Sequence, residues 1–531
     1  MGHILDVFHG IISAIILNCF LGVLFVLSLW HNYVTVHVKK LFDPRDTRSS
    51  HTNIKPPNNK RYPTRRYQKG RNPSFSSISS ETPLDLEDDE ENHIEYDHTI
   101  TTAASNPHTS SHPITSQVKY SQQENPFADI LTNEDRKLVP DLKYYYRQYG
   151  IDIEEFEVET DDGFIIDLWH LKSLKTEGKN KKDTYPILML HGLLQSSGAF
   201  ASCGRKSLAY FLHDSGYDVW LGNNRCGLKA KWNMEKLGND KKKKWDWDLN
   251  EMVKYDLKAL VEYTLAQTKF EKLTLVSHSQ GTTQGFMGLV NGDNLYDDRF
   301  KLIDKLENYV ALAPAVYPGP LLDEKAFVKF MALGIDNPWV FGTKSFIPMM
   351  MAMRSLMVGS KLFSFFSYIM FNYMFDWNDV LWDRILRDRN FLFSPVHISV
   401  KLMQWWLSSD PTKTSFKHNS EKIFPDNEIW FPVDGQTPGA DVSFQAPGKQ
   451  RTKDKIPNIL MFIPRQDRLV DGERLINHFI HHESHDIFNI WYIDEYSHLD
   501  VLWAHDVIER IGEPMIKHLR EPTEKGNGFE S

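Results

Sequence analysis

Cysteine is scarce in this 531-residue chain, and its three copies, Cys19, Cys203 and Cys226, form no Cys-x-x-Cys pair. So few cysteines exclude a disulfide-stabilised scaffold, and no Cys/His cluster has the spacing of a zinc site. Usable Asn-X-Ser/Thr glycosylation acceptors are missing too, because the single match, at 72–74, has proline as its central residue. Because the sequence has no zinc-site pattern, we expect a protein that needs no metal and no cofactor.

The chain has no excess of positive charge. It contains 61 Lys and Arg residues and 70 Asp and Glu residues, which gives a net charge of -9. This balance argues against a nucleic-acid partner. Apolar residues make up 41% and charged residues 25% of the sequence. These fractions exclude a fully disordered chain and a polytopic membrane protein.

Long apolar runs are rare, and the clearest is Ile11–Trp30, twenty residues without a charge. A helix of this length crosses about 30 Å of hydrocarbon, so we predict a transmembrane anchor at 11–30 behind a short tail at 1–10. The run is too long for a signal peptide and lacks a preceding basic segment. A buried core helix is the alternative interpretation.

The orientation of this anchor follows from basic residues. Lys39, Lys40, Arg45 and Arg48 all follow the apolar run, and no Lys or Arg precedes it. Positive residues near a span favour the cytosolic side, so we expect the rest of the chain to face the cytosol. The low cysteine count and the missing glycosylation acceptors agree with this side. A helix that enters a droplet monolayer without spanning it leaves the same marks.

The segment 31–133 predicts a disordered linker. It is rich in Ser, Thr, Asn and Pro and has no apolar periodicity. Its part 39–71 holds eleven basic residues and two acids, whereas 81–97 holds nine acids and no Lys or Arg. Charge blocks of this kind are typical of a solvated tail. We predict one folded domain at 134–520 and a C-terminal tail at 521–531.

Short apolar segments alternate with helical patterns in the predicted domain, which favours a mostly parallel sheet covered on both faces. A hairpin is expected where the turn Asp161–Gly163 joins two alternating segments. The predicted later strands are Tyr185–Leu190, Tyr217–Leu221, Leu273–Val276, Tyr309–Leu312, Ile459–Phe462 and Phe488–Ile493, with a helix over Asn250–Gln267 among the intervening segments.

The sharpest local feature is the pentapeptide Ser277–Gly281, which follows an apolar strand and opens a plausible helix. A strand–turn–helix of this kind lifts its central serine, Ser279, clear of the sheet as a nucleophile. It also aims the next backbone N–H, that of Gln280, at a developing oxyanion. Alone, the relaxed pattern is a weak signal, because its first position is Ser277 where glycine is usual.

A second backbone donor is expected from His191–Leu193, which ends an earlier strand. The N–H of Leu193 can lie beside that of Gln280, and two convergent amides stabilise an oxyanion by several kcal/mol. An ordinary strand-end turn is the alternative.

A serine nucleophile needs a base and an acid that orients it, and this fold supplies them in the order serine, acid, histidine. Asp467 directly follows the strand at Ile459–Phe462 and is the predicted acid. His498 follows the strand that ends near Ile493 and is the predicted base. Asp471 and Asp494 are rival acids, and His481, His482 and His485 are rival bases in a polar stretch expected at the surface.

With these residues in place, the chain from about Leu138 to Lys517 resembles the acid lipase family of α/β hydrolases, and within it the fungal membrane-anchored steryl ester hydrolases. The family positions for nucleophile, acid and base agree with Ser279, Asp467 and His498. Departures are Ser277 and Cys226, where relatives usually have glycine. The ordered matches are Glu157–Leu168, His191–Leu193, Trp220–Arg225, Trp245–Leu257, Ser277–Gly281, Asp467 and Tyr496–Asp500.

The resemblance implies an α/β-hydrolase fold and hydrolysis of steryl esters to free sterol and fatty acid through an acyl-enzyme. Triacylglycerols are the alternative substrates, and a catalytically inactive membrane-tethered scaffold is the alternative of a different class. The joint presence of nucleophile, acid, base and oxyanion loop favours the enzyme. The implied partners are neutral lipid esters and a membrane or droplet surface. The implied location is the endoplasmic reticulum, lipid droplets or the plasma membrane, as a single-pass protein.

An insertion at about 318–424 precedes the strand of the predicted acid. Half of the sixteen methionines fall between Met331 and Met374, and aromatic residues accompany them. Flexible thioethers and rings suit a pocket for long acyl chains or a sterol. We predict a helical cap that lines the site, with ordinary core packing as the alternative.

Overall fold

The protein is described by a computed structural model that covers residues 2–34, 65–66, 131–174, 184–240, 242–297, 299–437, 442–444 and 450–521. Most of the predicted linker at 31–133, with its basic and acidic blocks, lies outside the described residues. So does the predicted tail at 521–531, apart from residue 521.

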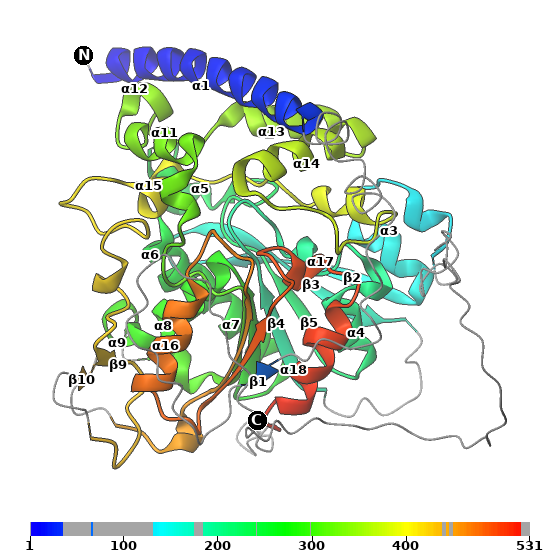
Figure 1. Ribbon diagram of the computed structural model, residues 1–531, viewed down its shortest axis with the longest axis vertical. Coiled ribbons are helices and arrows are strands. Elements are labelled where there is room, and N and C mark those ends of the chain that lie inside the picture. The colour runs from blue at the N-terminus through cyan, green and yellow to red at the C-terminus, as the bar shows by residue number, and fades with distance from the viewer. Residues whose placement is uncertain are drawn as a thin grey trace, which may run out of the picture. The chain divides into compact units, whose positions relative to one another are not determined.

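A twisted sheet with parallel central strands forms the core of the domain (Figure 1). Its strand order is β1-β12-β11-β8-β7-β4-β5-β3-β2, with β6 paired to β3. The strands from β12 to β5 are parallel, whereas β1, β2, β3 and β6 join antiparallel. The bounds are β1 (Arg65–Arg66), β2 (Ile151–Glu159), β3 (Phe164–Ser173), β4 (Pro186–Leu190), β5 (Asp218–Gly222), β6 (Lys231–Trp232), β7 (Leu273–His278), β8 (Leu306–Leu312), β11 (Asn458–Pro464) and β12 (Phe488–Ile493), while β9 (Glu428–Ile429) and β10 (Ser443–Phe444) pair separately.

Helices connect these strands, and the helix expected at 250–267 is interrupted by a π-helical turn at Met252–Leu257. The bounds of the helices in this part are α3 (Leu142–Tyr146), α4 (Leu208–Asp214), α5 (Met234–Leu237), α6 (Leu249–Glu251), α7 (Lys258–Thr268), α8 (Gln280–Val290), α9 (Gly292–Leu295), α16 (Gly472–His482), α17 (Asp500–Trp503) and α18 (Glu513–His518).

The helices cover both faces of the sheet, as continuous apolar strands require. Leu188 and Leu190 of β4 join the core on the side of α7, α8 and α16. Ile187 and Met189 point the other way, into the core on the side of α4 and α18. All five residues of β4 are buried, because its side chains point alternately into the two apolar cores on either face of the sheet. The predicted α/β fold with a mostly parallel sheet is confirmed.

Between β8 and β11 the chain leaves the sheet and forms a group of helices above its carboxyl edge (Figure 1). We call α10 to α15 the cap. Its bounds are α10 (Leu321–Glu324), α11 (Ala326–Gly334), α12 (Pro338–Phe341), α13 (Pro348–Met357), α14 (Lys361–Phe375) and α15 (Val400–Leu407).

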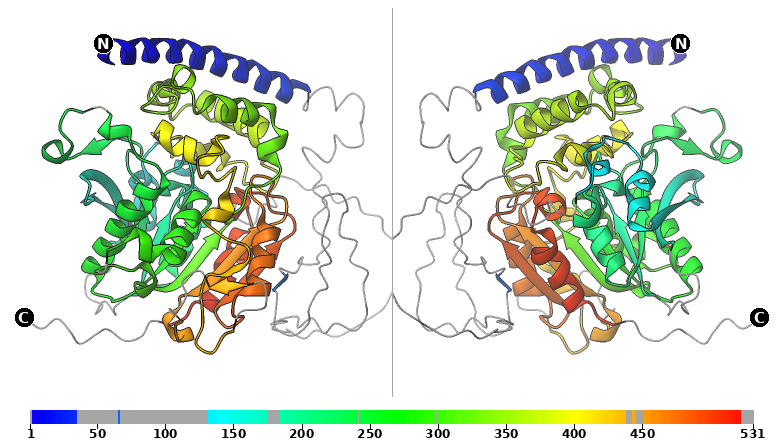
Figure 2. Two further views of the ribbon diagram at one scale, coloured as in Figure 1. Left: turned by 90° about the vertical axis from the view of Figure 1, so that its left-hand side faces the viewer. Right: turned by 90° about the vertical axis from the view of Figure 1, so that its right-hand side faces the viewer.

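The N-terminal apolar run forms one long helix, α1 (Gly2–Tyr33), which extends beyond both ends of the predicted 11–30. Its part Gly10–Tyr33 is, among the described residues, the one helix long and apolar enough to cross a membrane. This helix packs on the cap, with the Phe20 ring stacked on Phe327 and Phe330. Figure 2 shows α1 across the cap helices, on the side away from the sheet.

Candidate active site

Ser279 lies at the turn between β7 and α8, with its backbone at φ 51° and ψ -118°. A positive φ is uncommon for serine, and such strain marks the sharp turn that lifts the side chain above the sheet edge. The turn needs close packing, because a Cβ atom at Gly281 would lie 2.5 Å from the Leu190 carbonyl oxygen. Glycine at this position therefore allows α8 to start directly against the end of β4.

Three sequence-predicted residues from three strand ends meet in one chain of hydrogen bonds. His498 Nε2 lies 2.8 Å from Ser279 Oγ, and His498 Nδ1 lies 2.5 Å from Asp467 Oδ2. The other carboxylate oxygen of Asp467 accepts the backbone N–H of Leu469 at 2.9 Å, which fixes the rotamer of the acid. The Asp467 and His498 side chains are both 2% exposed, so water competes little for their contact.

The backbone and ring of His498 are held by neighbours that the sequence analysis did not assign. His278 Nε2 donates to the His498 carbonyl oxygen at 3.1 Å, so the residue before Ser279 braces the base. Burial lowers the pKa of His278 well below its ordinary value and keeps the imidazole neutral. The Trp377 ring of the cap stacks on His498, with centroids 5.4 Å apart and planes at 9°.

The rival carboxylates have structural partners elsewhere. Asp471 caps α16 and accepts the backbone N–H of Arg474 at 2.9 Å. Asp494 lies at the surface and faces Arg465 at 3.5 Å. Among the rival histidines, His481 donates back to the Asn477 carbonyl of its own helix. None of these three residues contacts Ser279 or His498 in the hydrogen bonds of the described chain.

The two predicted oxyanion donors lie on segments that pack against the serine. The loop after β4 passes so close that a Cβ atom at Gly192 would lie 3.0 Å from Ser279 Cβ, and Leu193 follows it at the cavity wall. Gln280 begins α8, whose first amides have no acceptor within the helix. The Leu193 and Gln280 segments therefore both lie directly beside Ser279.

His191 orders this loop. Its Nδ1 donates to the Gly192 carbonyl oxygen at 2.8 Å, and its Nε2 accepts the backbone N–H of Asn224 at 3.1 Å. Both ring nitrogens are thus satisfied by the neutral tautomer. Burial lowers the pKa of His191 to about 4, in agreement with these partners.

A deep apolar cavity of about 500 Å³ leads from Ser279 and His498 into the cap. Methionines of α13 and α14 contribute to its wall, as the sequence predicts, and so do residues of α1. A flexible apolar wall of this kind accepts long hydrocarbon groups. Among the residues that the structure describes, no group of three or more His, Cys, Asp or Glu side chains is arranged to hold a metal ion.

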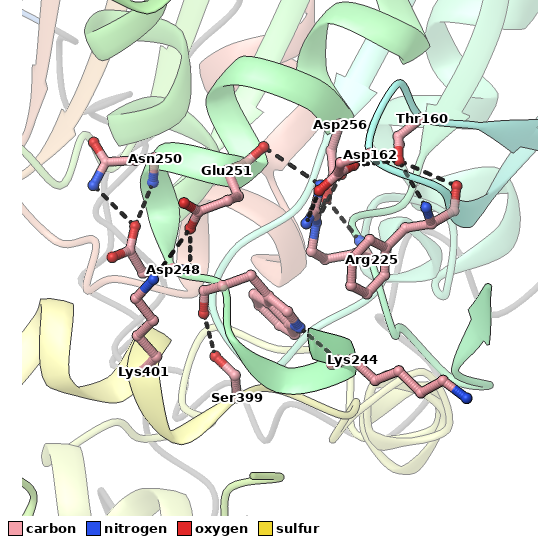
Figure 3. Close-up of polar contacts among 12 residues, drawn as sticks. Thr160, Asp162, Arg225, Lys244, Asp248, Asn250, Glu251, Asp256, Ser399 and Lys401 are labelled. Carbon is pink, nitrogen blue, oxygen red and sulfur yellow. Dashed lines mark hydrogen bonds and ion pairs between the residues drawn. The ribbon is translucent and has the colours of Figure 1, made fainter. Parts of the chain in front are cut away.

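Family-typical residues without a place in the cavity form a buried ion-pair network (Figure 3). The fully buried guanidinium of Arg225 lies 2.7 Å from Asp256 and 2.8 Å from Asp162. It also stacks on the Phe164 ring at 4.2 Å. Arg225 therefore ties the turn between β2 and β3 to the helix before α7, and its role is structural.

Comparison with known proteins identifies lipase and α/β-hydrolase relatives of this chain. Residues 142–204 match the partial alpha/beta-hydrolase lipase region, and residues 185–293 match the alpha/beta hydrolase fold family. The chain is 63% identical over 537 residues to sterol esterase 2 of Saccharomyces cerevisiae, an alignment that covers 98% of this chain and 99% of that protein.

More distant relatives share only parts of the chain. Human gastric triacylglycerol lipase is 33% identical over 204 residues, which cover 38% of this chain and 48% of that protein. Human lipase member J is 28% identical over 278 residues, or 51% of this chain and 68% of that protein. With its α/β sheet and its near full-length likeness to a sterol esterase, this chain belongs to the acid lipase family of α/β hydrolases, which are carboxylic ester hydrolases.

Proposed function

We propose that this protein hydrolyses steryl esters to free sterol and fatty acid at a lipid surface. The observation that carries the proposal is the chain of hydrogen bonds Ser279–His498–Asp467, whose serine and histidine line an apolar cavity of about 500 Å³. The near full-length likeness to a sterol esterase supports a steryl ester as the substrate.

In the proposed mechanism, Ser279 Oγ attacks the ester carbonyl carbon while His498 Nε2 takes the hydroxyl proton. The backbone N–H groups of Leu193 and Gln280 stabilise the oxyanion, and Asp467 stabilises the imidazolium. His498 then gives its proton to the departing sterol oxygen, which leaves an acyl-enzyme on Ser279. Water, deprotonated by His498, releases the fatty acid and restores the serine.

An inactive scaffold requires none of these contacts. The short His498 contacts to Ser279 and Asp467, and the apolar cavity that Ser279 and His498 line, favour a catalytic role over a scaffold. A triacylglycerol lipase of the same fold is the second candidate, because gastric triacylglycerol lipase is among the relatives.

One experiment separates the two substrates. The purified full chain is given steryl oleate and triolein at equal concentration in mixed micelles, and free sterol and free glycerides are measured. We expect sterol release to dominate. A chain that cleaves triolein and releases no sterol is a triacylglycerol lipase, which would overturn the proposed substrate.

We further propose that α1 holds the enzyme at the endoplasmic reticulum, lipid droplets or plasma membrane, with the catalytic domain in the cytosol. The uncharged run 11–30 and the basic residues Lys39, Lys40, Arg45 and Arg48 after it support this orientation, because anionic lipids of the cytosolic leaflet attract a basic segment beside α1. Protease added to intact microsomes or droplets is expected to digest the domain. Protection of the domain until detergent is added would contradict the cytosolic side.

A further inference from the structure

Exposed apolar side chains gather on one part of the described chain. Of the 21 large hydrophobic residues exposed there, ten lie on α1 and eight on cap helices α11 to α14. The remaining three are Leu174, Met234 and Val380. Leu333 of α11 and Leu356 of α13 are 80% and 84% exposed. An apolar surface of this extent marks contact with another apolar phase.

Helix α1 packs along the cap for nearly all of its apolar length. At one end Ser13 lies against Gly342, just after α12, and at the other the His31 ring lies 5.6 Å from Tyr373 of α14. At 1.5 Å per residue the stretch between Ser13 and His31 is about 27 Å long, close to the hydrocarbon thickness of a bilayer.

This packing decides how α1 can meet a membrane. If α1 crossed the bilayer upright, the cap along its side would enter the hydrocarbon with it. The exposed residues Lys329 of α11 and Lys361 of α14 would then lose their water, at a cost of several kcal/mol. Lying along the surface, α1 buries its exposed apolar face in lipid, and the charged residues keep their water.

The same helix borders the opening of the cavity. Leu21, Leu24 and Phe25 of α1 line the cavity, and Phe25 packs edge-on against Phe366 of α14. Lining residues that are also exposed mark where the cavity reaches the surface. On α1 these are Asn18 and Gly22, and on α13 they are Met349 and Met353.

We propose that α1 lies along the lipid surface and forms one side of the opening, so that a neutral lipid ester passes from the lipid into the cavity between α1 and α13. This inference rests on the proposed function and adds the route of the substrate. The occupant of the apolar surface is the hydrocarbon of a membrane or droplet, because the opening that leads to Ser279 lies within that surface.

A matched pair of glycine substitutions tests the route. A Cβ atom at Gly22 or Gly10 meets no atom within 4 Å, so both positions tolerate a larger residue, but only Gly22 lines the cavity. The full chain in liposomes that contain steryl oleate is assayed for sterol release and, separately, for hydrolysis of p-nitrophenyl butyrate. Gly22→Trp is expected to lower the ratio of the two rates by at least about tenfold, since its indole obstructs the opening.

Gly10→Trp is the control, and both of its rates are expected to match the unaltered protein. Equal ratios for Gly22→Trp and Gly10→Trp would overturn the route along α1. The unaltered protein tests the proposed function separately: sterol release that is absent while butyrate is cleaved rejects the steryl ester, whatever the variants do.

Cross-linking tests the position of α1 independently of activity. In a Cys19→Ser background, Phe25→Cys with Phe366→Cys joins two positions whose rings lie 4.7 Å apart. Val26→Cys with Phe366→Cys is the control, because Val26 is 62% exposed on the neighbouring face. In membranes a short bismaleimide is expected to join the first pair in preference to the second. No preference would show that α1 leaves the cap, and the proposal would be wrong.

Discussion

At the scale of single residues, three side chains hold His498 in place. Asp467 fixes one nitrogen, His278 fixes the backbone carbonyl, and Trp377 covers the face of the ring. Each contact acts on a different part of the same residue, so each can be removed separately.

Replacement of Asp467 tests the assignment of the acid. Asp467→Asn is expected to lower kcat by roughly four orders of magnitude, because a neutral amide stabilises neither the correct tautomer nor the imidazolium. Asp471→Asn and Asp494→Asn are expected to keep most of the activity, since their carboxylates cap α16 and face Arg465. Steady-state kinetics on a soluble ester measures all three. A larger loss in either control than in Asp467→Asn means that the acid is misassigned.

Trp377 is expected to be a positioning residue for the base. Its indole face, 5.4 Å from the imidazole centroid, favours the imidazolium that forms in the transition state. Trp377→Leu is expected to lower kcat on a short soluble ester by roughly tenfold, whereas Trp377→Phe keeps an aromatic face and most of the rate. Equal losses in Leu and Phe variants would show that only the volume of the side chain matters.

Sequence position alone could indicate Ser279, Asp467 and His498, because each follows an apolar strand and carboxyl ends of parallel strands meet at one edge. It could not indicate Trp377, which reaches His498 from the cap across more than a hundred residues of chain. The sequence analysis also gave no role to His278, although this residue is part of the pentapeptide Ser277–Gly281. Its contact to the His498 carbonyl oxygen depends on how two loops are placed in space. The spacing of residues along the chain does not specify that placement.

At the scale of elements, Arg225 joins β2, β3 and the helix before α7 through two carboxylates. Removal of the guanidinium leaves Asp256 buried and without its partner. Arg225→Met is therefore expected to destabilise the domain by about 3–5 kcal/mol, while Ser279→Ala, which leaves this network intact, changes stability little. Thermal unfolding in detergent compares the two variants. An unchanged midpoint for Arg225→Met would contradict a structural role.

The loop after β4 carries a pH dependence through His191. Burial lowers the pKa of His191 to about 4, below the ordinary value near 6.5. As pH falls below 6.5 the unfolded chain binds a proton that the folded loop excludes, so stability falls by about 2 kcal/mol between pH 7 and pH 5. His191→Gln lacks this titration, and its unfolding midpoint is expected to depend less on pH than that of the unaltered protein.

Asp500 makes a second pH-dependent contribution to stability, which the comparison with His191→Gln has to cancel. Burial raises the pKa of its carboxyl to about 6, which makes the folded state lose stability as pH rises from about 4 to 6. This opposite contribution is present in both proteins and cancels in their difference. Parallel pH profiles for the two proteins would mean that His191 is not held neutral.

The strands were predictable as elements, because buried parallel strands are short apolar runs bounded by turn residues. The interruption of the helix at 250–267 by a π turn was not, since the apolar periodicity of this segment gives no local signal for it. The cap was predictable as a methionine-rich insertion, but its contacts with α1 join segments that are remote in sequence and that no local pattern predicts.

At the scale of the whole molecule, the sequence predicts two separate parts, an apolar N-terminal anchor and a catalytic domain. The contacts of Phe20 with Phe327 and of Phe25 with Phe366 join them through the cap instead. The N-terminal helix thus also lines the cavity that contains Ser279. Composition predicted the affinity of α1 for hydrocarbon, but a hydropathy pattern carries no information on which surface the helix lies against.

Release of free sterol is the most direct measure of whether this molecule is a serine esterase for steryl esters. The purified full chain and its Ser279→Ala variant are incubated with steryl oleate in micelles, with equal folding checked by thermal unfolding. We expect release by the unaltered chain and none above background by the variant, because the acyl-enzyme cannot form without the Ser279 hydroxyl. Substantial sterol release by a folded Ser279→Ala variant would contradict it.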